Sequence, residues 1–290
     1  MILDKLKPLH QRVVVSVFSI AILLFVIAYS FTPYWAPLMP LSASIVIGFA
    51  MREYYKIARL KGLQPRAKLG IGLTVAYIFV IFLTTQTSFL DSLPLVTLGI
   101  TLIAIFSSYF CRGEDPFVGV AITLFAIIYL TIPLSYTIQI NYFFHTDGPQ
   151  DGRWWLFYLF AVTYLTDSSA LFIGKTLGAR KFAPYISPNK TWEGAIGGFL
   201  VAIVVSFVFY CFANIGENPI PIQLSFWHCI FLGSLISILA QFGDLAESLL
   251  KRDVGVKDSS KIPGLGGFLD VVDSLVFTAP LLYLYLNIVE

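Results

Sequence analysis

The sequence predicts an all-α, polytopic integral membrane protein with about nine transmembrane helices. Of the 290 residues, 57% are hydrophobic and only 12% are charged, and the mean hydropathy is +0.80. A soluble domain carries about 25% charged residues, so this chain has too little polar surface to be one. Its apolar runs are also long enough to cross a ~30 Å hydrocarbon core at about 1.5 Å per residue. We therefore expect a membrane-embedded protein without a nucleic-acid partner.

The apolar runs, taken in chain order, justify nine spans. They cover residues 13–32, 34–51, 69–87, 90–110, 117–138, 154–173, 193–213, 226–249 and 267–288. The apolar part of the first run exceeds the ~7 to 15 residues of a signal peptide and no small-residue cleavage site follows it, so we expect a retained helix. Prolines interrupt or flank the second, fourth and ninth runs and are expected to kink or shorten those helices.

The basic residues predict the orientation of these spans. With a cytosolic amino terminus and nine alternating spans, all of the 19 Lys and Arg residues except Arg153 fall on the cytosolic side. This partition follows the positive-inside rule and puts the carboxy terminus on the opposite side. We divide the chain into an N-terminal multi-span region, residues 1–150, and a C-terminal membrane region, residues 151–290, that carries the polar motifs.

Six carboxylates of the C-terminal region fall at span ends on this same cytosolic face. They are Asp167, Glu193, Asp244, Glu247, Asp270 and Asp273. An acidic group in hydrocarbon costs several kcal/mol unless it is paired, hydrated or bound to a metal. A single such residue is usually only interfacial, but the group of six indicates a cation site at the membrane surface.

The spacing of these residues adds detail to the predicted site. Asp244, Glu247, Ser248 and Lys251 lie at i, i+3, i+4 and i+7, so they share one face if the helix continues there. Asp270 and Asp273 are expected one turn apart at the start of the ninth helix. Basic side chains follow the eighth span and would suit a phosphate-rich substrate: Lys251, Arg252, Lys257 and Lys261.

The loop before the seventh span is the second polar region. It contains Ser187, Lys190, Thr191 and Glu193 ahead of a glycine-rich helix. Topology alone could explain a basic loop, but hydroxyl, ammonium and flexible backbone groups together also suit a phosphate or ribose. The later string Pro263-Gly264-Leu265-Gly266-Gly267 is weak evidence by itself, because glycines could simply let the chain re-enter the membrane surface.

Two blocks of residues resemble a known family. One is Ser248-x-x-Lys251-Arg252 with Lys257-Asp258, followed by Pro263-Gly264-x-Gly266-Gly267-x-x-Asp270-x-x-Asp273-Ser274; the other runs from Asp167-Ser168-Ser169 through Ser187-Pro188-x-Lys190-Thr191-Trp192-Glu193-Gly194. Both resemble the CDP-diacylglycerol synthases, also called phosphatidate cytidylyltransferases, over residues 160 to 280. Leu265 and Val271 stand where that family usually has His and Arg, which leaves open whether substrate handling differs.

The resemblance implies an enzyme that transfers a cytidylyl group from CTP to phosphatidate in phospholipid biosynthesis. Mg²⁺ would be held by Asp244, Asp270 and Asp273, and these three with Lys251 and Arg252 would form the catalytic group. The substrate-binding residues that it implies are Asp167, Ser187, Lys190, Thr191, Glu193, Glu247, Ser248, Lys257, Asp258, Gly266 and Gly267. The expected location is a bacterial inner membrane, and a homodimer is left open.

Other classes of function remain as alternatives. A related lipid-phosphate nucleotidyltransferase or lipid kinase would use similar groups, and a non-catalytic membrane protein derived from this fold would retain the helices. A secondary transporter would place its polar groups near mid-bilayer and often shows repeated halves, whereas these groups gather at one face and no internal repeat is visible.

Overall fold

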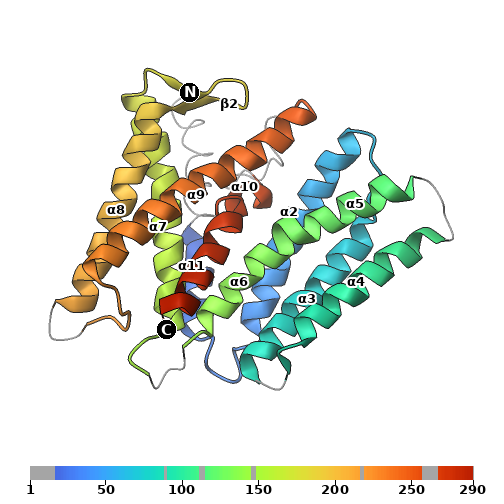
Figure 1. The fold of residues 1–290 in the computed structure, drawn as a ribbon, viewed down its shortest axis with the longest axis horizontal. Coiled ribbons are helices and arrows are strands. Elements are labelled where there is room, and N and C mark those ends of the chain that lie inside the picture. Colours follow the sequence, from blue (N-terminus) through green and yellow to red (C-terminus); the bar gives the residue numbers. More distant parts are fainter. Residues whose placement is uncertain are drawn as a thin grey trace. The chain divides into compact units, whose positions relative to one another are not determined.

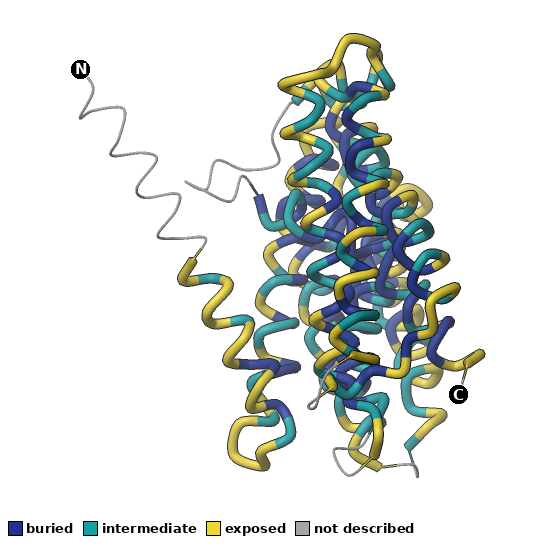
Figure 2. The backbone as a smooth tube through the Cα atoms, turned by 90° about the vertical axis from the view of Figure 1, so that its left-hand side faces the viewer, coloured by how far each residue is buried: buried dark blue, intermediate teal, exposed yellow. Residues whose placement is uncertain are grey.

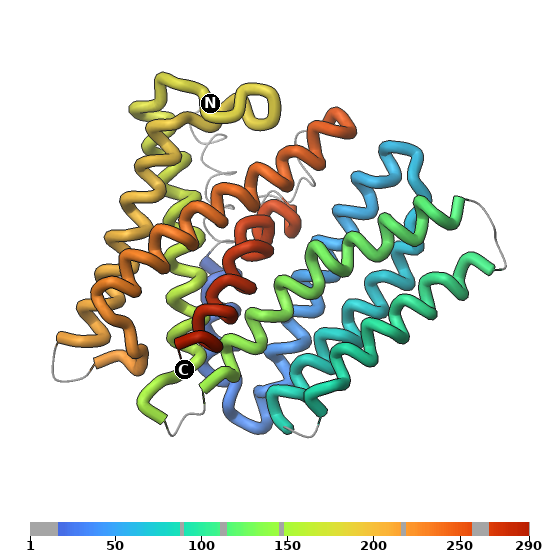
Figure 3. Tube along the Cα trace, in the orientation of Figure 1, coloured from blue at the N-terminus to red at the C-terminus, as the bar shows by residue number. Residues whose placement is uncertain are grey.

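The computed structural model describes residues 17–87, 90–110, 115–144, 148–215, 219–256 and 267–289, and most of them are helical (Figure 1). The chain forms two compact units. The first comprises Met1–Ile138 and Asp253–Val272, and the second comprises Gln139–Arg252 and Asp273–Glu290. Residues 253–272 thus belong to the first unit, although residues of the second unit precede and follow them in the sequence. Figure 3 colours the trace by residue number.

Seven helices in the described residues are long and apolar enough to cross a membrane. They are Ala67–Gln86, Leu93–Phe110, Pro116–Asn141, Gly152–Thr176, Trp192–Asn214, Phe226–Asp253 and Phe268–Val289. These correspond to the third through ninth predicted spans and confirm a polytopic helical membrane protein. The two N-terminal spans do not meet the same criteria: the described part of the first is the short helix Val17–Ala28, and helix α2 (Leu38–Leu60) carries charges along its second half.

The first unit is built around α2. The other elements of this unit are α3 (Ala67–Gln86), α4 (Leu93–Phe110), α5 (Pro116–Ala126), a π-helical turn η2 (Ile127–Thr131), the start of α6 (Ile132–Asn141) and the short α10 (Phe268–Val272). Helix α2 packs against α3 and α10. Buried hydroxyls of Thr74 and Thr131 lie 2.8 Å apart, so polar groups inside this apolar unit bond to each other.

The second unit contains the polar motifs. Its elements are α7 (Gly152–Thr176), strands β1 (Lys181–Ala183) and β2 (Ser187–Thr191), α8 (Trp192–Asn214), α9 (Phe226–Asp253, through Arg252) and α11 (Leu275–Val289). The two strands form an antiparallel hairpin in which Lys181 pairs with Thr191 and Ala183 with Ser187. The sequence predicts only a loop here, so this small sheet is an addition to the all-α prediction. It fixes the segment that carries Lys190.

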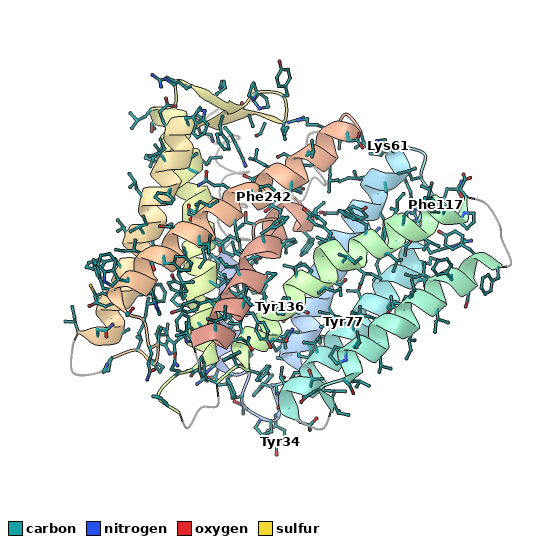
Figure 4. The ribbon with its side chains drawn as sticks, viewed as in Figure 1. Tyr34, Lys61, Tyr77, Phe117, Tyr136 and Phe242 are labelled. Carbon is teal, nitrogen blue, oxygen red and sulfur yellow. The ribbon has the colours of Figure 1, made fainter. Side chains whose placement is uncertain are left out.

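Large apolar side chains lie exposed along the helices of both units. Phe117 is 89% exposed, Phe172 is 68% exposed and Phe242 is 54% exposed. Figure 2 shows exposed residues recurring along the helices, and Figure 4 labels Phe117 and Phe242 on helix surfaces. Because water-soluble proteins rarely expose apolar surface on this scale, these faces are suited to contact with lipid.

A line of small residues brings α7 and α8 into close contact. A Cβ atom at Gly194 would lie 2.6 Å from the carbonyl oxygen of Ala170 and 3.0 Å from the Cα of Gly174. At Gly198 it would lie 2.9 Å from the carbonyl oxygen of Thr166. Small residues allow helix backbones to approach closely in membranes, where packing is a main source of helix association. This contact is made around Asp167, which follows Thr166 on α7.

The last predicted span is interrupted rather than continuous. Helix α10 ends at Val272, Asp273 and Ser274 form a turn, and α11 begins at Leu275. Asp270 and Asp273 thus lie at the start of this span, as expected, but Asp273 falls in the turn and not in a helix. The Ser274 amide donates to the Asp273 carboxylate over 2.6 Å, an interaction that competes with helical hydrogen bonding.

The α7–α8 contact leads to a prediction about stability. Gly194→Ala should lower the thermal unfolding temperature of the detergent-solubilised protein, because the added methyl group must separate the two helices, at a cost of about 1–3 kcal/mol. Gly72→Ala on α3 is the matched control, since nothing lies within 4 Å of a Cβ atom there. Equal unfolding temperatures for the two variants would show that the contact is looser than described.

Candidate functional site

The centre of the candidate site is an ion pair between the hairpin and α9. The Lys190 ammonium lies 2.7 Å from Oδ2 of Asp244 and donates a longer hydrogen bond of 3.5 Å to the carbonyl oxygen of Gln241. The Lys190 and Asp244 side chains are 23% and 37% exposed. The pair is thus half-buried, so a charged ligand could reach the Lys190 ammonium and the Asp244 carboxylate and replace one partner of the pair.

A second polar contact joins α7 to the turn before α11. The Ser274 hydroxyl donates to Oδ2 of Asp167 over 2.9 Å, and it also lies 3.3 Å from Oδ1 of Asp273. Asp273 is 5% exposed and Ser274 is 1% exposed. One serine therefore links two carboxylates that are 106 residues apart in the sequence.

Gly243 allows α9 to approach this turn. A Cβ atom at residue 243 would lie 2.9 Å from the Cα of Ser274 and even closer to the Asp273 backbone. No larger residue could occupy this position without moving α9 or the turn. Because Asp244 is the next residue, the glycine contact holds Asp244 near Asp273.

Asp167, Asp244 and Asp273 form what we call the acidic cluster. Asp273 interacts electrostatically with both of the other carboxylates and with Glu247, and Asp167 interacts with Asp244 and Lys190. Within the described ranges, no group of three or more His, Cys, Asp or Glu side chains has the arrangement of a protein-only metal site. Magnesium, however, is commonly bound by one or two carboxylates together with substrate phosphates, and the donor chemistry of the acidic cluster fits that mode.

The prediction that Asp244, Glu247, Ser248 and Lys251 share one helix face is confirmed, because α9 continues through Asp253. We call these four residues the α9 stripe. Lys251 forms an ion pair with Glu247 one turn earlier, and both side chains are buried, at 9% and 1% residue exposure. Ser248 is buried beside them. The exposed Arg252 donates from Nε to the carbonyl oxygen of Ile186 over 3.0 Å, which connects α9 to the hairpin turn.

Two residues predicted to bind substrate have structural hydrogen bonds in the loop. The Thr191 hydroxyl accepts from the Gly194 amide over 3.1 Å and caps α8. The Glu193 carboxylate accepts from the amides of Ala179 and Arg180, both at 3.1 Å. Ser187 lies in β2, paired with Ala183. The loop residues that remain best suited to meet a ligand are therefore Lys190 and the exposed basic side chains of the hairpin.

The remaining predicted residues divide between two locations. Gly267, Asp270 and Val271 lie in or beside α10 and belong to the first unit, whereas the acidic cluster belongs to the second. Lys257, Asp258, Lys261, Leu265 and Gly266 lie outside the described residues.

Three contributors to the site were not predicted as site residues: Gln241, Gly243 and Ser274. Gln241 donates to the carbonyl oxygen of Ala195 and the hydroxyl of Ser237, both at 3.2 Å, and receives Lys190 at its own carbonyl. A polar amide and a glycine inside an apolar helix are unfavourable unless they pack or bond, so Gln241 and Gly243 carried a detectable signal. The hydrogen bond from Ser274 to Asp167 depends on tertiary structure, so the sequence carried no signal for it.

The chain is similar to several known bacterial proteins. A phosphatidate cytidylyltransferase from Chlamydia muridarum is 38% identical over 181 residues, which is 60% of this chain and 57% of the relative. Relatives of the same name match over more of their length: the protein from Chlamydia pneumoniae is 32% identical over 97% of this chain and 93% of its own, and that from Bacillus subtilis is 32% identical over 96% and 97%.

The family match extends through both units. The sequence model of the Cytidylyltransferase family covers residues 10–289, which include every helix and strand described above. The acidic cluster, the hairpin lysine and the α9 stripe all fall within this range. The chain belongs to the Cytidylyltransferase family.

Proposed function

We propose that this protein transfers the cytidylyl group of CTP to phosphatidate, giving CDP-diacylglycerol and pyrophosphate. The family and the named relatives support the reaction. The observation that carries the proposal is the half-buried Lys190–Asp244 pair beside Asp167 and Asp273, within a protein whose helices are suited to a membrane. Such a site offers groups of both signs to a triphosphate while the lipid stays in the bilayer.

The reaction needs no protein nucleophile. An ionised oxygen of the phosphatidate phosphate attacks the α-phosphorus of CTP, and a new phosphorus–oxygen bond forms. The bond from the α-phosphorus to the oxygen bridging the α- and β-phosphates breaks, and its electron pair leaves with pyrophosphate. Catalysis therefore depends on positioning and on neutralising negative charge.

Basic side chains would neutralise the phosphates. Lys190 is held at the site by Asp244 and by the Gln241 carbonyl, and would turn toward a phosphate when CTP binds. Arg252 is exposed on α9 and Lys251 is buried one residue earlier. Arginine and lysine bound to phosphate form charge-assisted hydrogen bonds, which are stronger than neutral ones.

The acidic cluster supports the proposal that the enzyme uses Mg²⁺. Asp244 and Asp270, with Asp273 in support, would be its protein ligands, and the bound ion would neutralise the triphosphate. Asp167 is near enough to interact electrostatically with Asp244 and is held by Ser274, which makes it a further candidate for orienting this region. Asp270 is included because it occupies a position of the motif block that resembles the family.

The site would face the cytosol, where CTP is available. The hairpin with Lys181 and Lys190 lies at the end where α8 begins, and the connection from α8 to α9 lies at the other end of those helices (Figure 1). The basic residues favour a cytosolic hairpin by the positive-inside rule, and the bacterial relatives favour a bacterial inner membrane. Nine spans and a homodimer remain predictions.

The direct test is to incubate the purified protein with phosphatidate, Mg²⁺ and each of the four nucleoside triphosphates, and to measure pyrophosphate release. CTP should give the highest rate, and release should require phosphatidate. Release with CTP and a different lipid phosphate would favour a related nucleotidyltransferase. Transfer of a γ-phosphate without pyrophosphate would favour a lipid kinase, and no turnover would favour the non-catalytic alternative.

Orientation can be tested by cysteine labelling in intact cells. A cysteine at Lys181 in the hairpin should react with a membrane-impermeant reagent only after the cytosolic side is exposed, whereas one at Gln223 should react from outside. Both positions are exposed and belong to the same unit. Labelling of both from the same side would contradict the proposed topology.

The metal proposal predicts the effect of removing single charges. Asp244→Asn and Asp270→Asn keep the side-chain size but remove a charge on which Mg²⁺ binding depends, so each should lower turnover by orders of magnitude in a protein that still inserts. Asp91→Asn is the control, because Asp91 is exposed near the start of α4. Near-normal rates of both Asn variants across a magnesium titration would exclude the proposed metal site.

Lys251 needs a double variant, because its loss leaves the buried Glu247 without this counter-charge. Lys251→Met should lower both turnover and thermal stability. Adding Glu247→Gln should restore stability but not turnover if the Lys251 charge acts on phosphate. Recovery of turnover in the double variant would mean that Lys251 serves only to balance Glu247. Lys61→Ala, which removes an exposed ion pair with Asp253, should leave turnover nearly unchanged.

A further inference from the structure

Glu53 is a buried carboxylate in the first unit to which the family motif assigns no role. It lies on α2 and is 8% exposed, although its sequence neighbours Arg52 and Lys56 are exposed. Acidic residues are almost never this buried unless they bond to another group. The burial of Glu53 therefore points to a specific partner.

One such partner is the backbone at the start of α10. Oε2 of Glu53 accepts a hydrogen bond of 2.9 Å from the amide of Leu269, which is fully buried. Leu269 is the second residue of α10, and the first amides of a helix have no acceptor within the helix itself. The Glu53 carboxylate thus supplies the hydrogen-bond acceptor that α10 itself cannot supply for the Leu269 amide.

A ring contact of α2 reinforces this attachment, and a surface ion pair lies at the end of the same helix. The rings of Phe49 and Phe268 stack with centroids 4.9 Å apart, and Phe49 lies one turn before Glu53. Lys61, the C-cap residue of α2, forms an ion pair with Asp253 (Figure 4 labels Lys61). All of these residues belong to the first unit. Helix α2 therefore contacts the chain both where it leaves α9 and where α10 begins.

We infer that Glu53 is a positioning residue for cytidylyl transfer, holding α10 so that Asp270 is correctly presented. Asp270 is the residue after Leu269, and the turn with Asp273 directly follows α10. A shift of α10 would therefore displace Asp270. The inference rests on the proposed function, since it assigns Glu53 a role in that reaction, and it concerns a residue outside the two motif blocks.

The test compares three variants of the full-length protein in detergent. Glu53→Ala removes the acceptor, Glu53→Gln keeps an acceptor oxygen without the charge, and Arg52→Ala is the control on the exposed neighbouring residue. Glu53→Ala should lower kcat with phosphatidate and CTP by about tenfold or more, because loss of a hydrogen bond to a charged group would leave α10 out of position in most molecules. Glu53→Gln should keep most of the activity, and Arg52→Ala should match the wild type.

Hydrogen exchange supplies a readout that does not depend on activity. In Glu53→Ala, a peptide covering residues 267–275 should exchange faster than in the wild type, while peptides from α3 and α7 should be unchanged. An unchanged rate in that peptide, or wild-type kcat in Glu53→Ala, would overturn the inference. Faster exchange throughout the first unit would also overturn it, by showing a general role in folding. Absence of CTP-dependent turnover in the wild type would instead refute the proposed function.

Discussion

Acidic groups within membrane-suited helices must each be matched by a cation or a hydrogen-bond donor, and much of this structure follows from that requirement. Asp244 is matched by Lys190, Glu247 by Lys251, Asp167 by Ser274 and Glu53 by the Leu269 amide. An unmatched carboxylate in hydrocarbon would cost several kcal/mol. Each partner comes from a hairpin, a helical turn or a helix end, so the matching also fixes how these elements pack within their unit.

Close helix packing makes this matching achievable. Gly194 and Gly198 let α8 lie against α7, and Gly243 lets α9 lie against the turn at Asp273 and Ser274. As a result, Asp273 interacts with the carboxylates of Asp167 and Asp244, and Lys190 pairs with Asp244. The negative charges of these neighbouring carboxylates repel each other, and a bound cation would reduce that repulsion. The same glycines that permit packing therefore also bring together the carboxylates that we propose bind Mg²⁺ with the triphosphate.

The helices could be predicted from the sequence more fully than the positions of the charged side chains. Long apolar runs gave seven of the nine expected spans, because hydropathy over about 20 residues is a strong signal. The extension of α2 through Glu53 and Lys56 was missed, since helix formation does not stop where apolar character does. The helix break at Asp273 has no Gly or Pro to mark it in the sequence. It depends on the Ser274 hydrogen bonds and on the contact with Gly243.

Motif spacing in the sequence pointed to Asp244, Asp273 and Lys190 as site residues. The structural hydrogen bonds of Thr191 and Glu193, by contrast, could be found only from the folded hairpin.

The central claim is that the acidic cluster binds a divalent metal together with CTP, and direct metal binding tests it independently of turnover. Mn²⁺ can replace Mg²⁺ in the measurement, and electron paramagnetic resonance reports the fraction of Mn²⁺ that remains free. With CTP present, the wild-type protein should deplete the free signal beyond what CTP does alone, and Asp244→Asn should need about tenfold more Mn²⁺ for the same effect. Equal depletion by the two proteins would contradict the account.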